Sequence, residues 1–113
     1  MTTASVSAVS RAQTRRLAAR YRALADETRL RILLALSGRK VCVCELVDEL
    51  GISQPLLSFH LRALRGAGLV RSERRGRWND YVLAPEGLEA AEVFLSDLAA
   101  AHATTSPLAS CCE

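Results

Sequence analysis

The sequence predicts a mainly α-helical domain of the α+β class, with about five helices and a two-stranded β-hairpin. Apolar residues recur at three- and four-residue spacing in five segments, as amphipathic helices require. Only the segment that begins at residues 69–70 and the segment 78–83 have the character of strands, and residues 74–77, with Gly76, form a turn between them. The length of 113 residues suits one small domain with a modest core.

We expect the folded domain to cover residues 10–103, between a disordered N-terminus (1–9) and a short C-terminal tail (104–113) that carries two cysteines. No apolar run approaches membrane-spanning length, and the N-terminus lacks the features of a secretory signal. These observations predict a cytoplasmic protein with no membrane partner. All fifteen Lys and Arg residues but only seven of the twelve acids precede Pro85, so this part carries +8 and suits nucleic acid.

The first helix is expected over residues 10–24, with Leu17, Tyr21 and Leu24 on one face. Its five arginines form either a solvated face, which we favour, or a flank that meets DNA phosphates. Asp26 is a plausible N-cap for a second helix that ends near residues 37–38. The positions of this second helix that we expect in the core are Leu30, Leu33, Leu34 and Ala35.

Residues 44–66 predict two helices joined by a tight turn. Gly51 follows the last periodic residue of the first helix and can adopt the left-handed conformation that closes it. Ser53 offers an N-cap oxygen to the second helix, and Pro55 falls in its first turn, where the missing N–H costs little. This arrangement is typical of a helix-turn-helix unit.

The second helix of this unit has an apolar stripe, Leu57, Leu61 and Leu64, and a polar face on the opposite side. Amide, hydroxyl and guanidinium groups of this kind bond base edges and phosphates in DNA. The residues predicted to do so are Ser53, Gln54, Ser58, Arg62 and Arg65. His60 borders the leucine stripe, a position that favours a packing or phosphate-contacting role over a role as a metal ligand.

The hairpin that follows has a cationic tip. Six arginines lie between residues 62 and 77 against Glu73 alone, and this local excess suits a phosphate backbone. A basic hairpin directly after a polar helix is a wing, so the predicted fold is a winged helix-turn-helix. The predicted phosphate-binding residues of the wing are Arg74, Arg75 and Arg77. We expect Trp78 and Tyr81 to pack the hairpin against the core.

Four cysteines raise the question of a ligand. In a regular helix Cys42 and Cys44 would point about 200° apart and would not share one ion. If Cys42 lies just ahead of the helix in extended geometry, both sulfurs face the same way, and the helix N-terminus favours thiolates. Soft sulfur donors select thiophilic ions. The alternative is that Cys42 is a small buried hydrophobe and that Cys111 and Cys112 are incidental.

Four segments together resemble the ArsR/SmtB family of winged-helix metal-responsive repressors. They are LADETRLRILLAL (24–36), CVCEL (42–46), SQPLLSFHLRALRGAGLV (53–70) and RRGRWNDYVL (74–83), and the resemblance covers roughly residues 17–95. It implies a homodimer, built on the first and last helices, that leaves double-stranded operator DNA when a metal or metalloid binds. The last helix here is expected from Pro85 to about His102, with Leu88, Ala91, Leu95 and Leu98 at helical spacing.

The chain departs from the arsenic sensors of that family at one position. Those proteins carry a third cysteine one turn into the helix, where this chain has Val47. A site for As(III) or Sb(III) made of three thiols therefore needs Cys111 or Cys112, on a tail that spans at most about 20 Å from residue 105. The family's other common site uses paired His and acid ligands on the last helix, and His102 alone predicts no zinc site there.

Three classes of function follow. The leading one is a repressor with As(III) or Sb(III) as inducer at Cys42, Cys44, Cys111 and Cys112, without an organic cofactor. Alternatives on the same scaffold are a cadmium or lead sensor and a DNA-binding thiol redox sensor. A thiol enzyme is disfavoured, because no CxxC motif precedes a helix in a βαβ pattern and no acid–base pair is organised around a thiol.

Overall fold

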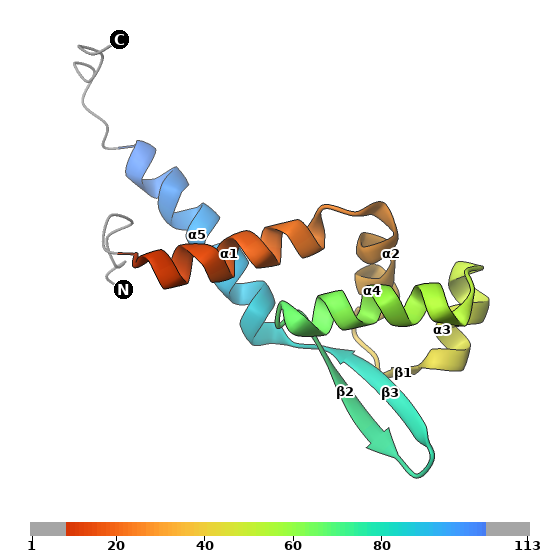
Figure 1. The fold of residues 1–113 in the computed structure, drawn as a ribbon. Helices are drawn as coiled ribbons and strands as arrows, with labels where there is room; N and C mark the ends of the chain where they lie inside the picture. Colours follow the sequence, from red (N-terminus) through yellow and green to blue (C-terminus); the bar gives the residue numbers. More distant parts are fainter. Residues whose placement is uncertain (1–8, 104–113) are drawn as a thin grey trace.

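The structure is a computed structural model that describes residues 9–103, and it confirms a winged helix-turn-helix fold with five helices (Figure 1). Its elements in chain order are α1 (Arg11–Leu24), α2 (Glu27–Ala35), β1 (Val41–Cys42), α3 (Val43–Leu50), α4 (Gln54–Gly66), β2 (Val70–Arg75), β3 (Trp78–Leu83) and α5 (Pro85–His102). In Figure 1, α1 and α5 cross at one end of the molecule, and the β2–β3 hairpin projects away from α4. No helix within the described residues is long and apolar enough to span a membrane.

The helices begin where the sequence places capping residues. Ser10 caps α1 in a reciprocal arrangement with Gln13, and the Asp26 side chain accepts a hydrogen bond from the backbone N–H of Arg29 at the start of α2. Gly51 ends α3 with φ of 68°, the left-handed conformation expected there. The Ser53 side chain then accepts from the backbone N–H of Leu56 and begins α4. The helix-turn-helix unit is therefore encoded locally.

The core lies between α2, α3, α4 and the base of the sheet. Its largest fully buried side chains are Ile32, Leu36, Leu46, Leu57, Leu61, Leu64, Leu69, Val41 and Val70. The expectation for α2 was wrong at two positions, since Leu30 is 46% exposed and Leu34 is 74% exposed. Because α2 is apolar on more than one side, its periodicity does not identify which side is buried, and the fully buried residue of the helix is Ile32.

The sheet has three antiparallel strands in the order β1-β3-β2, one more than the predicted hairpin. The additional strand is the pair Val41–Cys42, which lies opposite Tyr81 and Asp80 of β3. Tyr81 packs against the core as predicted, but Trp78 is 52% exposed, so its predicted packing role is wrong. Trp78 pairs with Arg75 beside the turn, where the hairpin extends beyond the helices.

Candidate DNA-binding surface and thiol site

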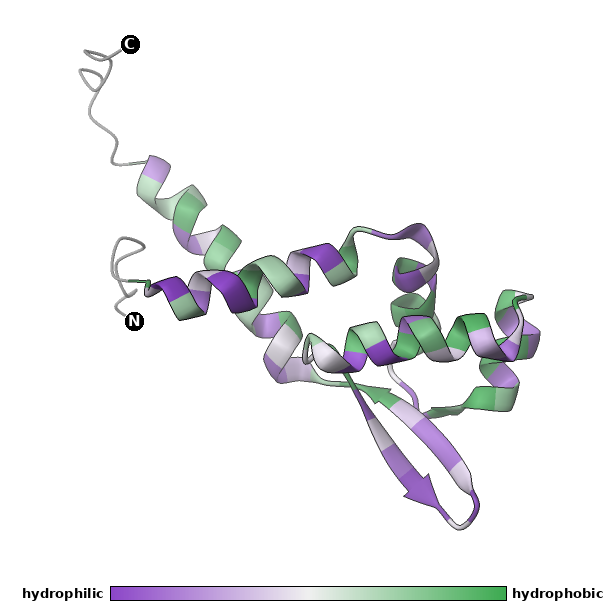
Figure 2. Cartoon of the chain, viewed as in Figure 1, coloured by the Kyte–Doolittle hydropathy of each residue, from purple (hydrophilic) through white to green (hydrophobic). Residues whose placement is uncertain are grey.

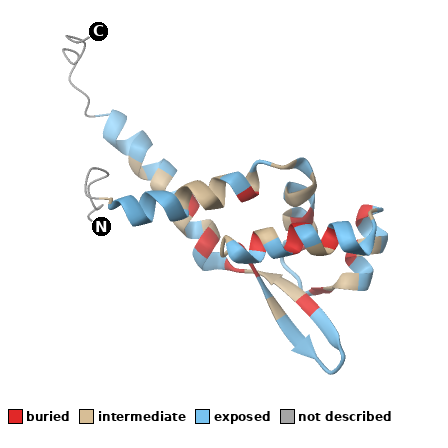
Figure 3. Ribbon diagram, in the orientation of Figure 1, coloured by how far each residue is buried: buried red, intermediate tan, exposed pale blue. Residues whose placement is uncertain are grey.

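Helix α4 separates an apolar side from a polar side. Leu57, Leu61 and Leu64 are buried against the core (Figure 3), whereas Gln54, Arg62 and Arg65 are exposed and Ser58 is half-buried. The orientation predicted from the spacing is therefore correct for the polar face. Its role in binding DNA stays a prediction, as does that of the N-cap residue Ser53.

A side-chain contact fixes α4 against α2. His60 is only 7% exposed, and its Nδ1 accepts a hydrogen bond of 3.0 Å from Nε of Arg29. The backbone N–H of Arg29 is itself held by the Asp26 carboxylate, and its guanidinium lies 5.8 Å from the centre of the Phe59 ring. His60 thus has the packing role that the sequence favoured. The Arg29 contact had no sequence signal, because the two residues lie 31 positions apart.

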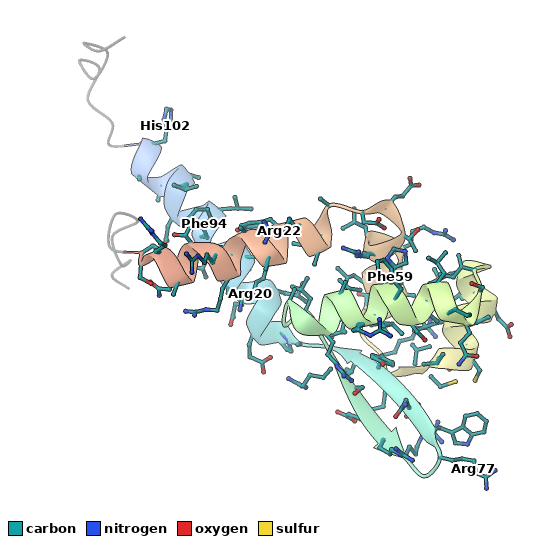
Figure 4. All side chains as sticks on the ribbon, viewed as in Figure 1. Arg20, Arg22, Phe59, Arg77, Phe94 and His102 are labelled. Carbon is teal, nitrogen blue, oxygen red and sulfur yellow. The ribbon has the colours of Figure 1, made fainter. Side chains whose placement is uncertain are left out.

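The three wing arginines have different surroundings. Arg75 forms two hydrogen bonds to the buried Asp80 carboxylate, of 2.8 and 3.2 Å, and this pairing lowers the pKa of Asp80. Arg74 donates to the backbone oxygen of Gly76 in the turn. Within residues 9–103, the structure gives Arg77 neither a hydrogen bond nor an ion pair, and Figure 4 shows it at the outer end of the hairpin. Arg77 is therefore the wing arginine best placed to meet a phosphate.

The register of the hairpin explains the Asp80 pair. Glu73 of β2 lies directly opposite Asp80 of β3, an arrangement of like charges that destabilises a sheet unless it is compensated. Each carboxylate has its own cation, because Glu73 pairs with Lys40 at 2.7 Å and Asp80 pairs with Arg75. Arg75 accordingly stabilises the wing, a role that sequence reasoning missed when it grouped Arg75 with the DNA-binding arginines.

The two thiols lie at the junction of β1 and α3. Cys42 is the N-cap of α3, with the extended angles φ −82° and ψ 159°, and Cys44 is the second residue of the helix. This is the geometry in which both sulfurs can face the same way. A hydrogen bond between the two thiols raises the pKa of Cys44, with burial adding to the rise, and this outweighs the lowering by backbone N–H groups at the helix start. The backbone N–H groups at the helix start thus favour the Cys44 thiolate as expected, but the Cys42 thiol and burial leave the pKa of Cys44 raised overall.

Cys44 lies beside the candidate DNA-binding surface, by which we mean the polar face of α4 together with the wing. It lines a cleft of about 260 Å³ together with residues from the first turn of α3, the start of α4 and the wing. Those residues are Val43, Gln54, Arg77, Trp78 and Asn79. The fold thus brings the exposed thiol beside two of the residues predicted to bind DNA, although the sequence separates Cys44 from Arg77 by 33 positions.

The described residues supply two thiols but no complete metal site. Within residues 9–103, no three His, Cys, Asp or Glu side chains are grouped closely enough to hold an ion. Val47, at the position of the family's third thiol, is half-buried against the core. Cys111 and Cys112 lie outside the described residues, so their predicted part in the site stays a prediction.

Helices α1 and α5 pack together and leave several apolar side chains of α5 exposed. The hydroxyl of Tyr21 donates to the backbone oxygen of Ala91 at 2.7 Å, and the rings of Tyr21 and Phe94 are 6.1 Å apart. The exposed large hydrophobic residues of α5 are Val93, Leu95 and Leu98. Figure 2 shows hydrophobic positions continuing along the outer half of α5.

A polar helix presented outward from a helix-turn-helix unit, with a basic hairpin beside it, defines a winged helix-turn-helix domain, a class that reads DNA with the second helix of the unit. The chain belongs to the ArsR family of bacterial regulatory proteins, whose family description matches residues 26–72. The resemblance of the sequence to this family of regulators is thereby confirmed.

Relatives and solved structures agree with this membership. The arsenic resistance transcriptional regulator ArsR1 of Pseudomonas putida is 45% identical over 67 residues, covering 58% of this chain and 52% of that protein. The HTH-type transcriptional repressor SmtB of Mycobacterium tuberculosis is 49% identical over 67 residues, covering 59% of this chain and 50% of that protein. The aligned region therefore spans about half the length of each of these two relatives.

The fold is similar to solved ArsR-type structures over most of its length. An ArsR-like transcriptional regulator from Rhodococcus sp. RHA1 superposes with a TM-score of 0.77 and 29% identity, covering 84% of this chain and 87% of that one. The homodimeric winged helix-turn-helix domain of Mb0332 from Mycobacterium bovis superposes with a TM-score of 0.65 and 29% identity, covering 82% and 84%.

Proposed function

We propose that the protein is a homodimeric transcriptional repressor that binds double-stranded operator DNA in the cytoplasm and is released when As(III) or Sb(III) binds its cysteine thiolates. The observation that carries the proposal is the cleft shared by Cys44, Gln54 and Arg77. A group bound at the thiol meets the start of α4 and the wing, the two elements that a winged helix-turn-helix domain presents to DNA.

The dimer is supported by the exposed apolar side chains of α5 and by the homodimeric state named for the M. bovis domain. A second copy packed on α1 and α5 removes exposed leucine and valine side chains from water. In such a dimer the two α4 helices enter successive major grooves, about 34 Å apart, on one side of a palindromic site.

The choice of inducer rests on the type of atom that would bind it, which is the sulfur of cysteine. Two sulfur ligands favour a thiophilic ion, and the P. putida relative is named for arsenic resistance. The M. tuberculosis relative is named SmtB and is of similar identity, so sequence identity alone does not choose the ion. Cadmium and lead are the competing soft ions. We assign the third thiol to Cys111 or Cys112, since Val47 supplies none.

The energetic demand on this switch is modest. A hundredfold loss of operator affinity needs a coupling of about 2.7 kcal/mol between inducer and DNA, which lies within the usual range for allosteric proteins. Linkage requires operator DNA to weaken inducer binding by the same factor. As(III) arrives as the neutral hydroxide, and each hydroxide that it loses leaves as water with one thiol proton, so its binding releases no net proton. A cadmium or lead cation would instead displace the thiol protons, and its binding would weaken as pH falls because the pKa of Cys44 is raised.

The test is fluorescence anisotropy of the reduced protein on DNA from upstream of its own gene, with arsenite, antimonite, cadmium and zinc added in turn. Cys44→Ala should keep operator affinity and lose release, whereas Arg62→Ala should weaken operator binding by roughly tenfold and keep metalloid binding. A Cys111→Ser, Cys112→Ser double variant tests whether the tail thiols are needed for release from the operator. A Cys44→Ala protein that arsenite releases as readily as wild type would refute the proposed site.

A thiol redox sensor is the second candidate, and the contact between Cys42 and Cys44 favours it, because an oxidised thiol condenses with a neighbouring thiol to form a disulfide. The same titration separates the two candidates. Release by metalloid under reducing conditions supports the metalloid sensor. Release by peroxide alone, reversed by dithiothreitol, supports the redox sensor.

A further inference from the structure

A second cleft lies where α1, the end of α4, the base of the wing and the start of α5 meet. Its volume is about 560 Å³, and three of its lining residues are arginines from three different elements, Arg20 of α1, Arg65 of α4 and Arg71 of β2. The only carboxylate among its lining residues is that of Glu86. The lining therefore carries an excess of two positive charges.

Arg20 is the unusual member of this group. The sequence favoured a solvated position for every arginine of α1, yet Arg20 is half-buried and its Nε is buried without a hydrogen-bond partner among the described residues. A buried guanidinium N–H that lacks an acceptor is costly, and the great majority of such groups are satisfied. An acceptor supplied by a ligand would remove this cost.

The other two arginines are held in place by their neighbours. Arg65 donates from Nη1 to the Ser72 hydroxyl at 3.0 Å, and Arg71 lies 3.1 Å from the Glu86 carboxylate in an exposed ion pair. These contacts use only part of each guanidinium, which has five N–H donors. Both residues therefore keep donors for an oxyanion in the cleft.

We infer that this cleft binds a phosphate group, contributed either by the DNA backbone or by a free phosphate ion. Guanidinium groups present paired N–H donors that match phosphate oxygens, and a cluster of them compensates the charge. Arg65 also belongs to the polar face of α4, so the cleft continues the candidate DNA-binding surface towards α1. A phosphate held there joins a helix of the proposed dimer interface to the DNA. The DNA source rests on the proposed function, whereas the anion site does not.

The matched variants are Arg20→Gln and Arg22→Gln. Both remove one positive charge from α1, but two residues of separation point the side chains about 200° apart, and Arg22 is exposed and lines no part of this cleft. Figure 4 labels both residues on α1. Circular dichroism establishes that each variant is folded, and Arg65→Gln, at an exposed position, serves as a second cleft variant if Arg20→Gln does not fold.

The first arm measures operator affinity against salt concentration. If the phosphate belongs to DNA, Arg20→Gln reduces the slope of log affinity against log salt by about 0.9 for each protomer, and Arg22→Gln leaves the slope close to that of wild type. The second arm titrates inorganic phosphate, at ionic strength matched with chloride, into DNA-free protein. If the source is free phosphate, it raises the Tm of wild type and Arg22→Gln but not that of Arg20→Gln.

The two arms keep this inference distinct from the proposed function. A wild-type protein that binds no DNA would refute the repressor, while a phosphate response that depends on Arg20 would still support the anion site. Equal salt slopes and equal phosphate responses for Arg20→Gln and Arg22→Gln overturn the site.

Discussion

Gly87 offers a sharp test of how α5 joins the DNA-binding half of the domain. A Cβ placed on Gly87 would lie 1.9 Å from the backbone oxygen of Gly68 and 2.7 Å from its carbonyl carbon, whereas real Cβ contacts essentially never fall below 3.0 Å. Gly87→Ala must therefore move α5 away from residue 68 by roughly 1 Å. Because the obstacle is backbone, overpacking should lower the free energy of unfolding by about 1–3 kcal/mol, despite the better helix propensity of alanine.

The assay is thermal unfolding followed by circular dichroism, at one fixed protein concentration because a dimer's Tm depends on concentration. For a domain of this size the loss corresponds to a fall in Tm of roughly 4–15 °C. Gly66→Ala is the control, since Gly66 is helical and nothing lies within 4 Å of its Cβ position. It should be as stable as wild type or slightly more stable. The close contact between α5 and residue 68 is refuted if Gly87→Ala behaves in the same way.

Three further predictions concern the wing and the thiol cleft. Arg75→Ala should destabilise the fold, whereas Arg77→Ala should leave stability unchanged. Arg77→Ala should instead reduce the slope of log DNA affinity against log salt by about 0.9 per protomer. Equal losses of Tm in the two variants would contradict the different roles of these arginines. Asp80 has a lowered pKa, so its pairing stabilises the protein fully above the ordinary carboxyl pKa of about 3.9 and less as pH falls through the lowered value. Asp80→Asn should therefore flatten the acid side of the stability profile measured by urea unfolding. Trp78 is the single tryptophan and shares a cleft with Cys44, so arsenite should change its fluorescence in wild type but not in Cys44→Ala.

The helix-turn-helix unit was predictable because its signals are local. Gly51, Ser53 and Pro55 each act within a few residues of their own position. The leucine spacing of α4 marks its buried side correctly, although Leu56 and Phe59 are also apolar and are exposed. In α2, by contrast, apolar residues occupy more than one side, and the side that is buried depends on where α4 lies. The sequence of α2 alone does not show where α4 lies, and for this reason Leu34 was wrongly expected in the core.

The remaining differences come from pairings between distant residues. β1 is only two residues long and forms because β3 lies beside it. A segment of two residues is too short for a pattern of alternating side chains to predict a strand. The Arg75–Asp80 pair depends on the register of the hairpin, and the Trp78 exposure depends on how far the hairpin extends past the helices. The extended geometry of Cys42 was correctly anticipated, and the binding of one ion by both thiols stays a prediction. The cleft that joins Cys44 to the wing could be found only from the fold.

The position of Cys42 has a consequence for mutagenesis. Cys42 is the N-cap of α3 but makes no side-chain cap hydrogen bond, whereas serine at that position is among the best caps and is worth about 1 kcal/mol to a helix. Serine, the usual sulfur-free substitute, would therefore remove a ligand and strengthen the eight-residue helix in one step. If a Cys42→Ser protein never leaves its operator, either the lost sulfur ligand or the strengthened helix could be the cause. In a Cys42→Ala protein only the lost ligand could be the cause. The wild-type chain forgoes that helix stability at the point where its sensitivity to thiophilic ions would reside.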